Sequence, residues 1–149
     1  MTTRVTDAPL ELAPLLAETE DDACGALVIF SGVVRNTNDG RPVSGMTYDA
    51  HVALAERVLA EIEAEALARF GVRHCRIVHR VGTLALGEVS VYVVVRAAHR
   101  AEAFEAARYA IDEVKARAPI WKEEHYTDGA SRYLDGTPLR IPSPEADAR

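Results

Sequence analysis

Four segments of the chain have the apolar, β-branched composition of buried or half-buried strands. They are CGALVIFSGVVR (24–35), VSGMTYDA (43–50), HCRIVHRVG (74–82) and VSVYVVVRAA (89–98). The last segment is the most strand-like in the chain, and the second is the weakest. Turn-forming residues follow the first segment, and a glycine-bounded connection, TLALGE, separates the third from the fourth. The pattern therefore predicts two successive pairs of strands.

Two further segments repeat their apolar residues with a helical period. Residues 51–71 carry a stripe of Leu54, Val58, Leu59, Ile62, Ala66 and Phe70, with acidic residues opposite and Gly71 placed as the C-terminal cap. A second helix is expected to begin near residues 98–101 and to end before Pro119. Residues 120–126 are expected to be extended, and 131–134 to form a short strand. The order β-β-α-β-β-α-β-β indicates an α+β fold with two main helices packed on a mixed or antiparallel sheet.

Length and composition favour one domain over residues 1–149, with loosely ordered or partner-ordered ends at 1–22 and 135–149. The longest apolar run, about residues 24–34, is too short to span a bilayer. The first 22 residues lack the basic and apolar regions of a secretory signal. We therefore expect a cytoplasmic protein that does not bind membranes.

Charge and motifs exclude several classes of function. The net charge of −6 argues against non-specific nucleic-acid binding, which needs a basic face. No Walker loop, GxGxxG, GxSxG or HExxH motif occurs. The five histidines lack metal-ligand spacing, and His74 and His79 are interpreted as ordinary polar strand positions. Cys24 and Cys75 are interpreted as two small buried residues on strands. We expect neither a metal nor a cofactor.

The distribution of lysine is unusual. The chain has 17 lysines and arginines, and only Lys115 and Lys122 are lysines, both within KARAPIWK. Genomic base composition explains an excess of arginine but not the clustering of the two lysines. A lysine amine can lose its proton when it is desolvated, whereas a guanidinium stays charged. The clustering therefore suggests amine chemistry, although a helix-end cation (Lys115) and an exposed strand salt bridge (Lys122 with Glu123 or Glu124) remain the simpler interpretations.

Three other basic residues stand where an anion site is plausible. His99 and Arg100 end the most strand-like segment and open the second helix, where free backbone amides and the helix dipole favour an anion. Arg35 ends the first strand. Each of the three is also compatible with an ordinary solvated surface position.

Taken together, these segments resemble the large subunit of molybdopterin synthase. The resemblance is carried by FSGVVRN (30–36), IVHRVG (77–82), AHRAEAFEA (98–106) and KARAPIWKEE (115–124), in the order and spacing of that family. It spans roughly residues 25–134. The combination of KxRxPxWK with a preceding helix that starts at His-Arg is specific to this family. Glu123 departs from the pattern, because many relatives have a basic residue there.

The resemblance implies an α/β-hammerhead fold and a sulfurtransferase. Family members form a homodimer flanked by two copies of a small ubiquitin-like sulfur carrier, giving a heterotetramer. The Gly-Gly tail of the carrier, as a thiocarboxylate, enters the pocket of the large subunit. Two sulfurs pass to cyclic pyranopterin monophosphate and form the dithiolene of molybdopterin, a step of molybdenum cofactor biosynthesis.

The resemblance also implies roles for individual residues. Lys115 and Lys122 are the expected catalytic residues. Our own hypothesis, beyond the resemblance, is that Lys115 stabilises a developing oxyanion at the carrier carbonyl and that Lys122 is the general acid or base. The expected substrate-binding residues are Val33, Val34, Arg35, His99, Arg100, Lys115, Lys122, Glu123 and Glu124, and Phe30 is a possible pocket wall.

One expectation follows from helix geometry alone. If Arg100 starts and Lys115 ends one helix, a rise of 1.5 Å per residue separates them by roughly 20 Å. That is about twice the length of a pterin monophosphate, so each site is expected to take His99 and Arg100 from the other subunit. The alternative to an enzyme is a dimeric α+β module that binds an anionic metabolite or a partner tail.

Overall fold

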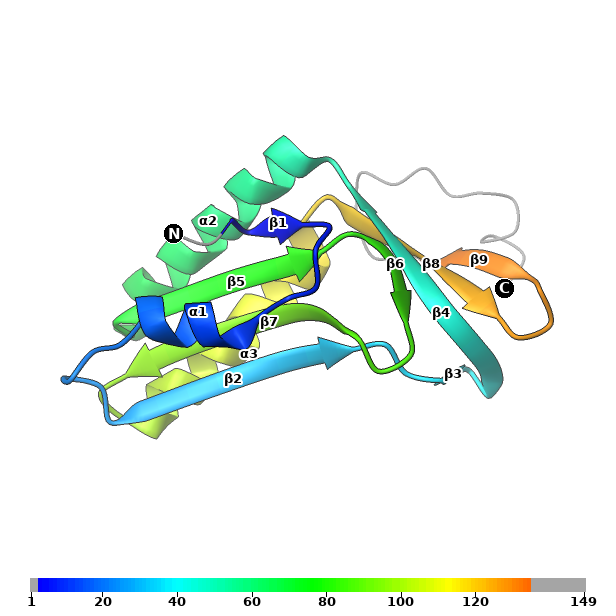
Figure 1. Cartoon of the computed structure of the whole chain (residues 1–149). Coiled ribbons are helices and arrows are strands. Elements are labelled where there is room, and N and C mark those ends of the chain that lie inside the picture. Colours follow the sequence, from blue (N-terminus) through cyan, green and yellow to red (C-terminus); the bar gives the residue numbers. More distant parts are fainter. Residues whose placement is uncertain (1–2, 135–149) are drawn as a thin grey trace.

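The strands pair into two sheets that meet at one side of the molecule (Figure 1). The computed structural model describes residues 3–134. Its elements are β1 (Val5–Thr6), α1 (Leu12–Glu18), β2 (Ala26–Val33), β3 (Thr37–Asn38), β4 (Arg41–Ala50), α2 (Val52–Phe70), β5 (His74–Arg80), β6 (Gly82–Ala85), β7 (Val89–Ala97), α3 (Arg100–Arg117), β8 (Ile120–Tyr126) and β9 (Ser131–Leu134). The α+β class predicted from the sequence is confirmed, with helices packed on mixed and antiparallel sheets.

The first sheet has the strand order β1-β5-β7-β2 and is mixed, because β1 runs parallel to β5 while the other pairs are antiparallel. Helices α2 and α3 cover one face, and the short α1 lies on the opposite face (Figure 1). The main core therefore lies between the two long helices and alternate residues of β5 and β7, such as Ile77, Val93 and Val95.

Local signals set the ends of the long helices. The imidazole of His51 accepts a hydrogen bond from the Leu54 amide at the start of α2 (3.2 Å), and Gly71 ends the helix in the left-handed conformation that glycine tolerates (φ 67°). Helix α3 runs from Arg100 to Arg117 and stops before Pro119, as the sequence predicts.

The second sheet is antiparallel, with the order β3-β4-β8-β9 and with β6 paired to β4. A small apolar cluster of Val34, Met46, Tyr48 and Leu84 fills the space between this sheet and the first one. The sequence analysis expected a connection where the structure has strand β6. The strand was not visible in the sequence because its hydrogen bonds go to β4, which is distant along the chain. Three segments thus come together at the border of the two sheets: the segment after β2, the β5–β6 region and β8.

The N-terminal segment corrects one expectation. Residues 1–22 were expected to be loosely ordered or partner-ordered, but residues 3–22 include β1 and α1 within the single chain, with Leu15 fully buried and Val5 8% exposed. Pro14 did not prevent α1, because proline is tolerated in the first turn of a helix. Residues 1–2 and the tail 135–149, expected to be loosely ordered or partner-ordered, lie outside the described residues.

Charged side chains hold this N-terminal segment in place. Glu63 of α2 is 7% exposed and accepts hydrogen bonds from the guanidinium groups of Arg4 (2.8 Å) and Arg76 (2.8 Å) and from the Ile77 amide (2.9 Å). Arg76, 6% exposed, also donates to Glu18 of α1 (2.7 Å). One carboxylate thereby joins β1, α2 and β5, while Arg76 connects it to α1.

Replacing Glu63 with glutamine is expected to lower the free energy of unfolding by about 3 kcal/mol, because the buried guanidinium of Arg76 loses a compensating charge. Urea denaturation followed by circular dichroism measures this change. Glu61→Gln on the same helix is the control, since Glu61 is 54% exposed at its side chain and lies 3.8 Å from Arg117. Equal stability of the two variants would show that the Glu63 network is not stabilising.

In the part of the chain that the structure describes, no helix is long and apolar enough to cross a membrane.

Candidate active site

The two lysines come together although they lie on different elements. Lys115 is in the last turn of α3, and Lys122 is in β8 with its Cα opposite that of Tyr48 in β4. The positive charge of Lys115 lowers the pKa of Lys122, which shows that the two ammonium groups are electrostatic neighbours. The chain therefore places its only two amine side chains in one site.

Burial lowers the pKa of both lysines below the usual value, because desolvation disfavours the charged amine. At Lys122 burial is the largest cause, and the charges of Lys115 and Arg35 add to it, while Glu124 acts in the opposite direction. Lys115 as a whole residue is solvent-exposed, yet enough protein surrounds its amine to lower the pKa. A lysine whose pKa is lowered in this way gives up its proton more readily than an exposed lysine does.

The position of Arg35 is set by Val34, the buried residue that precedes it. Val34 is 2% exposed and packs in the cluster with Tyr48, and its backbone bonds to Glu88 (3.0 Å) and Gly87 (2.8 Å) fix its position. Arg35 is exposed, and its charge acts on Lys122. The structure thus places the charge of Arg35 where it acts on Lys122, and the role of Arg35 in substrate binding stays a prediction.

Strand alternation separates the two glutamates that follow Lys122. Glu124 lies on the same face of β8 as Lys122, is 4% exposed, and accepts hydrogen bonds from Asn38 (2.8 Å) and Tyr126 (2.7 Å). Glu123 pairs in register with Thr47 and points to the other face, because successive strand residues alternate. Within one chain, Glu123 therefore points away from Lys122, and its role in substrate binding stays a prediction.

His79 is a site residue that the sequence analysis missed. It lies at the end of β5, is 5% exposed, and makes an edge-on contact with the ring of Tyr48, with the ring centroids 5.0 Å apart. Burial lowers its pKa to about 4, and the charges of Lys115 and Lys122 contribute. Its position in IVHRVG, one of the family-like segments, was the available signal; its spacing from His74 was not informative.

His99 and Arg100 do not join the lysines within one chain. Both are exposed at the start of α3, while Lys115 lies at its end, about 20 Å away at 1.5 Å per residue. The side chain of His99 is 83% exposed and lies 3.7 Å from Glu102. Phe30 and Val33 are exposed on β2, which has a free edge in the described sheet.

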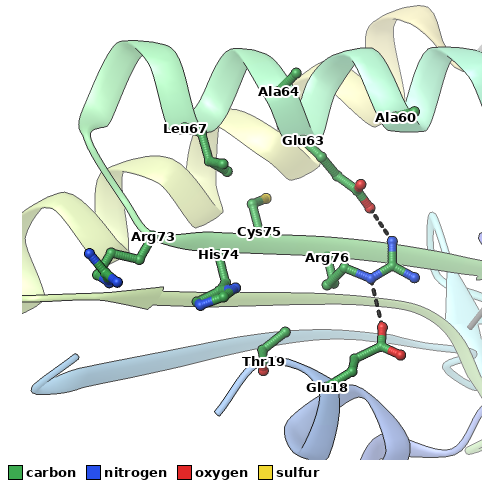
Figure 2. Close-up of a pocket in the computed structure, with 10 residues that line it drawn as sticks. All are labelled: Glu18, Thr19, Ala60, Glu63, Ala64, Leu67, Arg73, His74, Cys75 and Arg76. Atoms are coloured by element: carbon green, nitrogen blue, oxygen red, sulfur yellow. Dashed lines mark hydrogen bonds and ion pairs between the residues drawn. The ribbon is translucent and has the colours of Figure 1, made fainter. Parts of the chain in front are cut away.

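A large cavity of about 510 Å³ lies elsewhere, between α2 and β5 (Figure 2). Its charged lining residues largely neutralise one another: Figure 2 shows Arg76 between Glu63 and Glu18. Cys75 there is buried and its pKa is raised to about 12, so its thiol stays protonated. Neither lysine lines this cavity, and we place the chemistry at the lysine pair instead. Within residues 3–134, no group of histidine, cysteine, aspartate and glutamate side chains is arranged to hold a metal ion.

The fold and the site together define an α+β protein with a cationic cluster built around two amines of lowered pKa. The model of the MoaE protein family matches residues 5–117, a range that contains Arg35, His79 and Lys115 and ends before Lys122. The chain belongs to this family of molybdopterin synthase catalytic subunits.

Among relatives, the molybdopterin synthase catalytic subunit of Nostoc sp. is 45% identical over 87% of this chain and 79% of its own length. That of Oryza sativa subsp. japonica is 47% identical over 80% of this chain, which spans 62% of the longer rice protein. The structure of molybdopterin synthase from Staphylococcus aureus matches with a TM-score of 0.84 at 31% identity, over 89% of this chain and 97% of that one. A complex of subunits 1 and 2 of the molybdopterin-converting factor from Helicobacter pylori shares the fold (TM-score 0.69, 24% identity, 93% and 92% coverage).

Proposed function

We propose that this protein is the catalytic subunit that transfers two sulfurs from a thiocarboxylated carrier to cyclic pyranopterin monophosphate, and that Lys115 and Lys122 carry out the transfer. The observation that carries the proposal is the convergence of the only two lysines in one site, both with lowered pKa. A module that only binds an anionic metabolite or a partner tail has no need of an amine with a lowered pKa.

The charge of the site suits the two reactants. The substrate phosphate and the carrier thiocarboxylate are both anions, and Arg35, Lys115 and Lys122 supply cations around one space. The planar guanidinium of Arg35 is able to hold a phosphate through two hydrogen bonds. Each transfer moves one sulfur from the carrier to the substrate and leaves a carboxylate on the carrier, so that sulfur and oxygen exchange one for one.

We assign different roles to the two lysines. Lys122 is the general acid or base, because burial and two cationic neighbours all favour its neutral amine. Lys115 supplies positive charge to the oxyanion that develops at the carrier carbonyl, a role that its more exposed position at the end of α3 allows. The backbone bonds of Val34 fix the start of the segment that follows β2, which keeps the charge of Arg35 near Lys122.

The site is proposed to be completed by a second copy of the chain. The substrate phosphate lies within reach of the lysines, while His99 and Arg100 are about 20 Å away at the other end of α3. In a homodimer these two residues are supplied by the partner subunit. Two carriers on this dimer give a heterotetramer, and the reaction is proposed to take place in the cytoplasm.

The test is reconstitution. The purified chain is expected to co-elute with a ubiquitin-like protein that ends in Gly-Gly, and to form molybdopterin when the thiocarboxylated carrier and cyclic pyranopterin monophosphate are added. The carrier with an ordinary carboxylate is the control, since it binds but has no sulfur to give. Binding without product would instead support the dimeric binding module, and the absence of both would refute the proposal.

A further inference from the structure

The turn between β6 and β7 holds the backbone of Val34. The Val34 amide donates to the carbonyl oxygen of Glu88 (3.0 Å), and the Gly87 amide donates to the carbonyl oxygen of Val34 (2.8 Å). In Figure 1 this turn lies beside the end of β2, where the chain leaves the sheet. Because both backbone polar groups of Val34 bond to one turn, the position of that turn sets where Arg35, the next residue, leaves the strand.

The pairing of β2 with β7 is irregular just before Val34. Gly32 lies opposite Val91 and Val33 lies opposite Val89, so Ser90 is an extra residue on β7. Such a bulge bends the strand locally and changes the direction of the residues beyond it. The regular ladder therefore does not carry on to Val34, and its two bonds to the turn replace that ladder.

The carboxylate of Glu88 keeps the turn in shape and joins it to β5. One of its oxygens accepts a hydrogen bond from the Ala85 amide (2.7 Å), and the other accepts one from Nη1 of Arg80 at the end of β5 (3.0 Å). The Glu88 amide donates back to the Ala85 carbonyl (3.2 Å), and Gly87 adopts the left-handed conformation that glycine tolerates (φ 82°). One side chain thus closes the turn and fixes it to the neighbouring strand.

The guanidinium of Arg80 in turn depends on Glu88. The side chain of Arg80 is 13% exposed, and its Nε is buried without a hydrogen-bond partner among residues 3–134. In the described part of the chain, Glu88 is the carboxylate that pairs with it. Removing the partner of a largely buried charge is costly, so this ion pair holds the turn more firmly than an exposed pair would.

Contacts lead from Val34 to the lysine site. The side chain of Val34 is 2% exposed and packs in one cluster with Tyr48. The Cα of Tyr48 lies opposite that of Lys122 across β4 and β8. A shift of Val34 would therefore move Arg35 relative to the strand that carries Lys122.

We propose that Glu88 is a positioning residue for Arg35: its carboxylate holds the β6–β7 turn against β5, and the turn holds Val34, so that Arg35 is presented to an anionic group of the substrate. Glu88 acts through the backbone and does not itself contact the substrate. The inference rests on the proposed role of Arg35 in phosphate binding and adds the residue that fixes its position.

Nuclear magnetic resonance on the full chain, without ligand, tests the positioning itself. In Glu88→Ala, the ¹⁵N order parameter of the Arg35 amide is expected to fall from about 0.85 to below about 0.6, the range of flexible backbone. The buried Val34 amide is expected to exchange its proton with solvent about tenfold faster, because the turn that carries its acceptor is loosened.

Asp128→Ala is the matched control. Asp128 has the same two kinds of contact at the turn between β8 and β9, since its carboxylate accepts from the Ala130 amide (2.9 Å) and pairs with Arg41 (3.1 Å). This substitution is expected to leave the amides of Val34 and Arg35 unchanged. A change of equal size in both variants would show a general loosening of the chain and would overturn the assignment.

Calorimetric titration with cyclic pyranopterin monophosphate measures the effect on binding. Glu88→Ala is expected to weaken the affinity about tenfold, the size of one charge-assisted hydrogen bond. The rate of sulfur transfer at saturating pterin is expected to stay within about twofold, because only binding is affected. In an Arg35→Ala background the Glu88 substitution is expected to cost nothing further, since it acts through Arg35.

An Arg35 amide that stays ordered in Glu88→Ala would overturn the inference, and so would additive losses of affinity in the double variant. If Glu88→Ala does not fold, Glu88→Gln takes its place. Its amide oxygen still accepts from Ala85 but the ion pair with Arg80 is lost, so smaller changes in the same direction are expected. The resonance measurements need neither carrier nor pterin. A chain that fails to bind the pterin or to form molybdopterin would therefore count against the proposed function alone.

Discussion

Lys122→Ala is expected to reduce molybdopterin formation by about 10²- to 10⁴-fold, the usual contribution of a general acid or base. Lys122→Arg is expected to be nearly as inactive, because a guanidinium keeps the charge but does not release its proton. Lys115→Arg is expected to retain more activity than Lys115→Ala, since the role proposed for Lys115 requires charge alone. Single-turnover assays with the thiocarboxylated carrier measure all four variants.

Arg57→Ala is a suitable control for these variants, because Arg57 is an exposed cation. It lies on α2, whereas Lys115 lies on α3 and Lys122 on β8. Its activity is expected to equal that of the unaltered chain. If both lysine-to-arginine variants kept full activity, amine chemistry would be excluded and the site would act only through its positive charge. The reverse order, with Lys115→Arg inactive and Lys122→Arg active, would exchange the two roles.

Mixing two inactive variants is expected to restore activity if the site is shared between subunits. Arg100→Ala chains and Lys115→Ala chains, unfolded together and refolded, form heterodimers in which one site has both residues and the other has neither. With random pairing and two sites per dimer, about a quarter of the activity of the unaltered protein should return. Product formation by the mixture, compared with each parent alone, is the measurement.

A second mixture provides the matched control. Lys115 and Lys122 belong to the same site of one chain, so heterodimers of Lys115→Ala and Lys122→Ala chains have a defect in both sites. This pair should not recover. Recovery in both mixtures would point to an effect of refolding, and recovery in neither would mean that His99 and Arg100 do not serve the site of the partner subunit.

The long elements were predictable because their signals are local. The apolar stripe of α2 and its Gly71 cap, and the end of α3 before Pro119, depend on residues within a few turns. Strand β6 depends on pairing with β4, and the ordering of residues 3–22 depends on Glu63, which is far along the chain. Such contacts leave no periodic pattern in the segments that they order.

The site was partly predictable for the same reason. Lysine clustering within eight residues is visible in the sequence, and the resemblance named Arg35. His79 was missed because its importance depends on Tyr48 and on the Arg80 carbonyl, which the fold brings to it. The sequence motif does not show on which face of its strand Glu123 lies, whereas the register with Thr47 does.

The length of α3 has a consequence for variation within the family. The helix joins the basic residues at its start to Lys115 at its end, and in the proposed dimer these ends serve two different sites. Inserting or deleting four residues, one turn, would preserve the buried face of the helix but move the two ends by about 6 Å relative to each other. We therefore expect relatives to differ freely in the exposed side chains of this helix while keeping its number of residues constant.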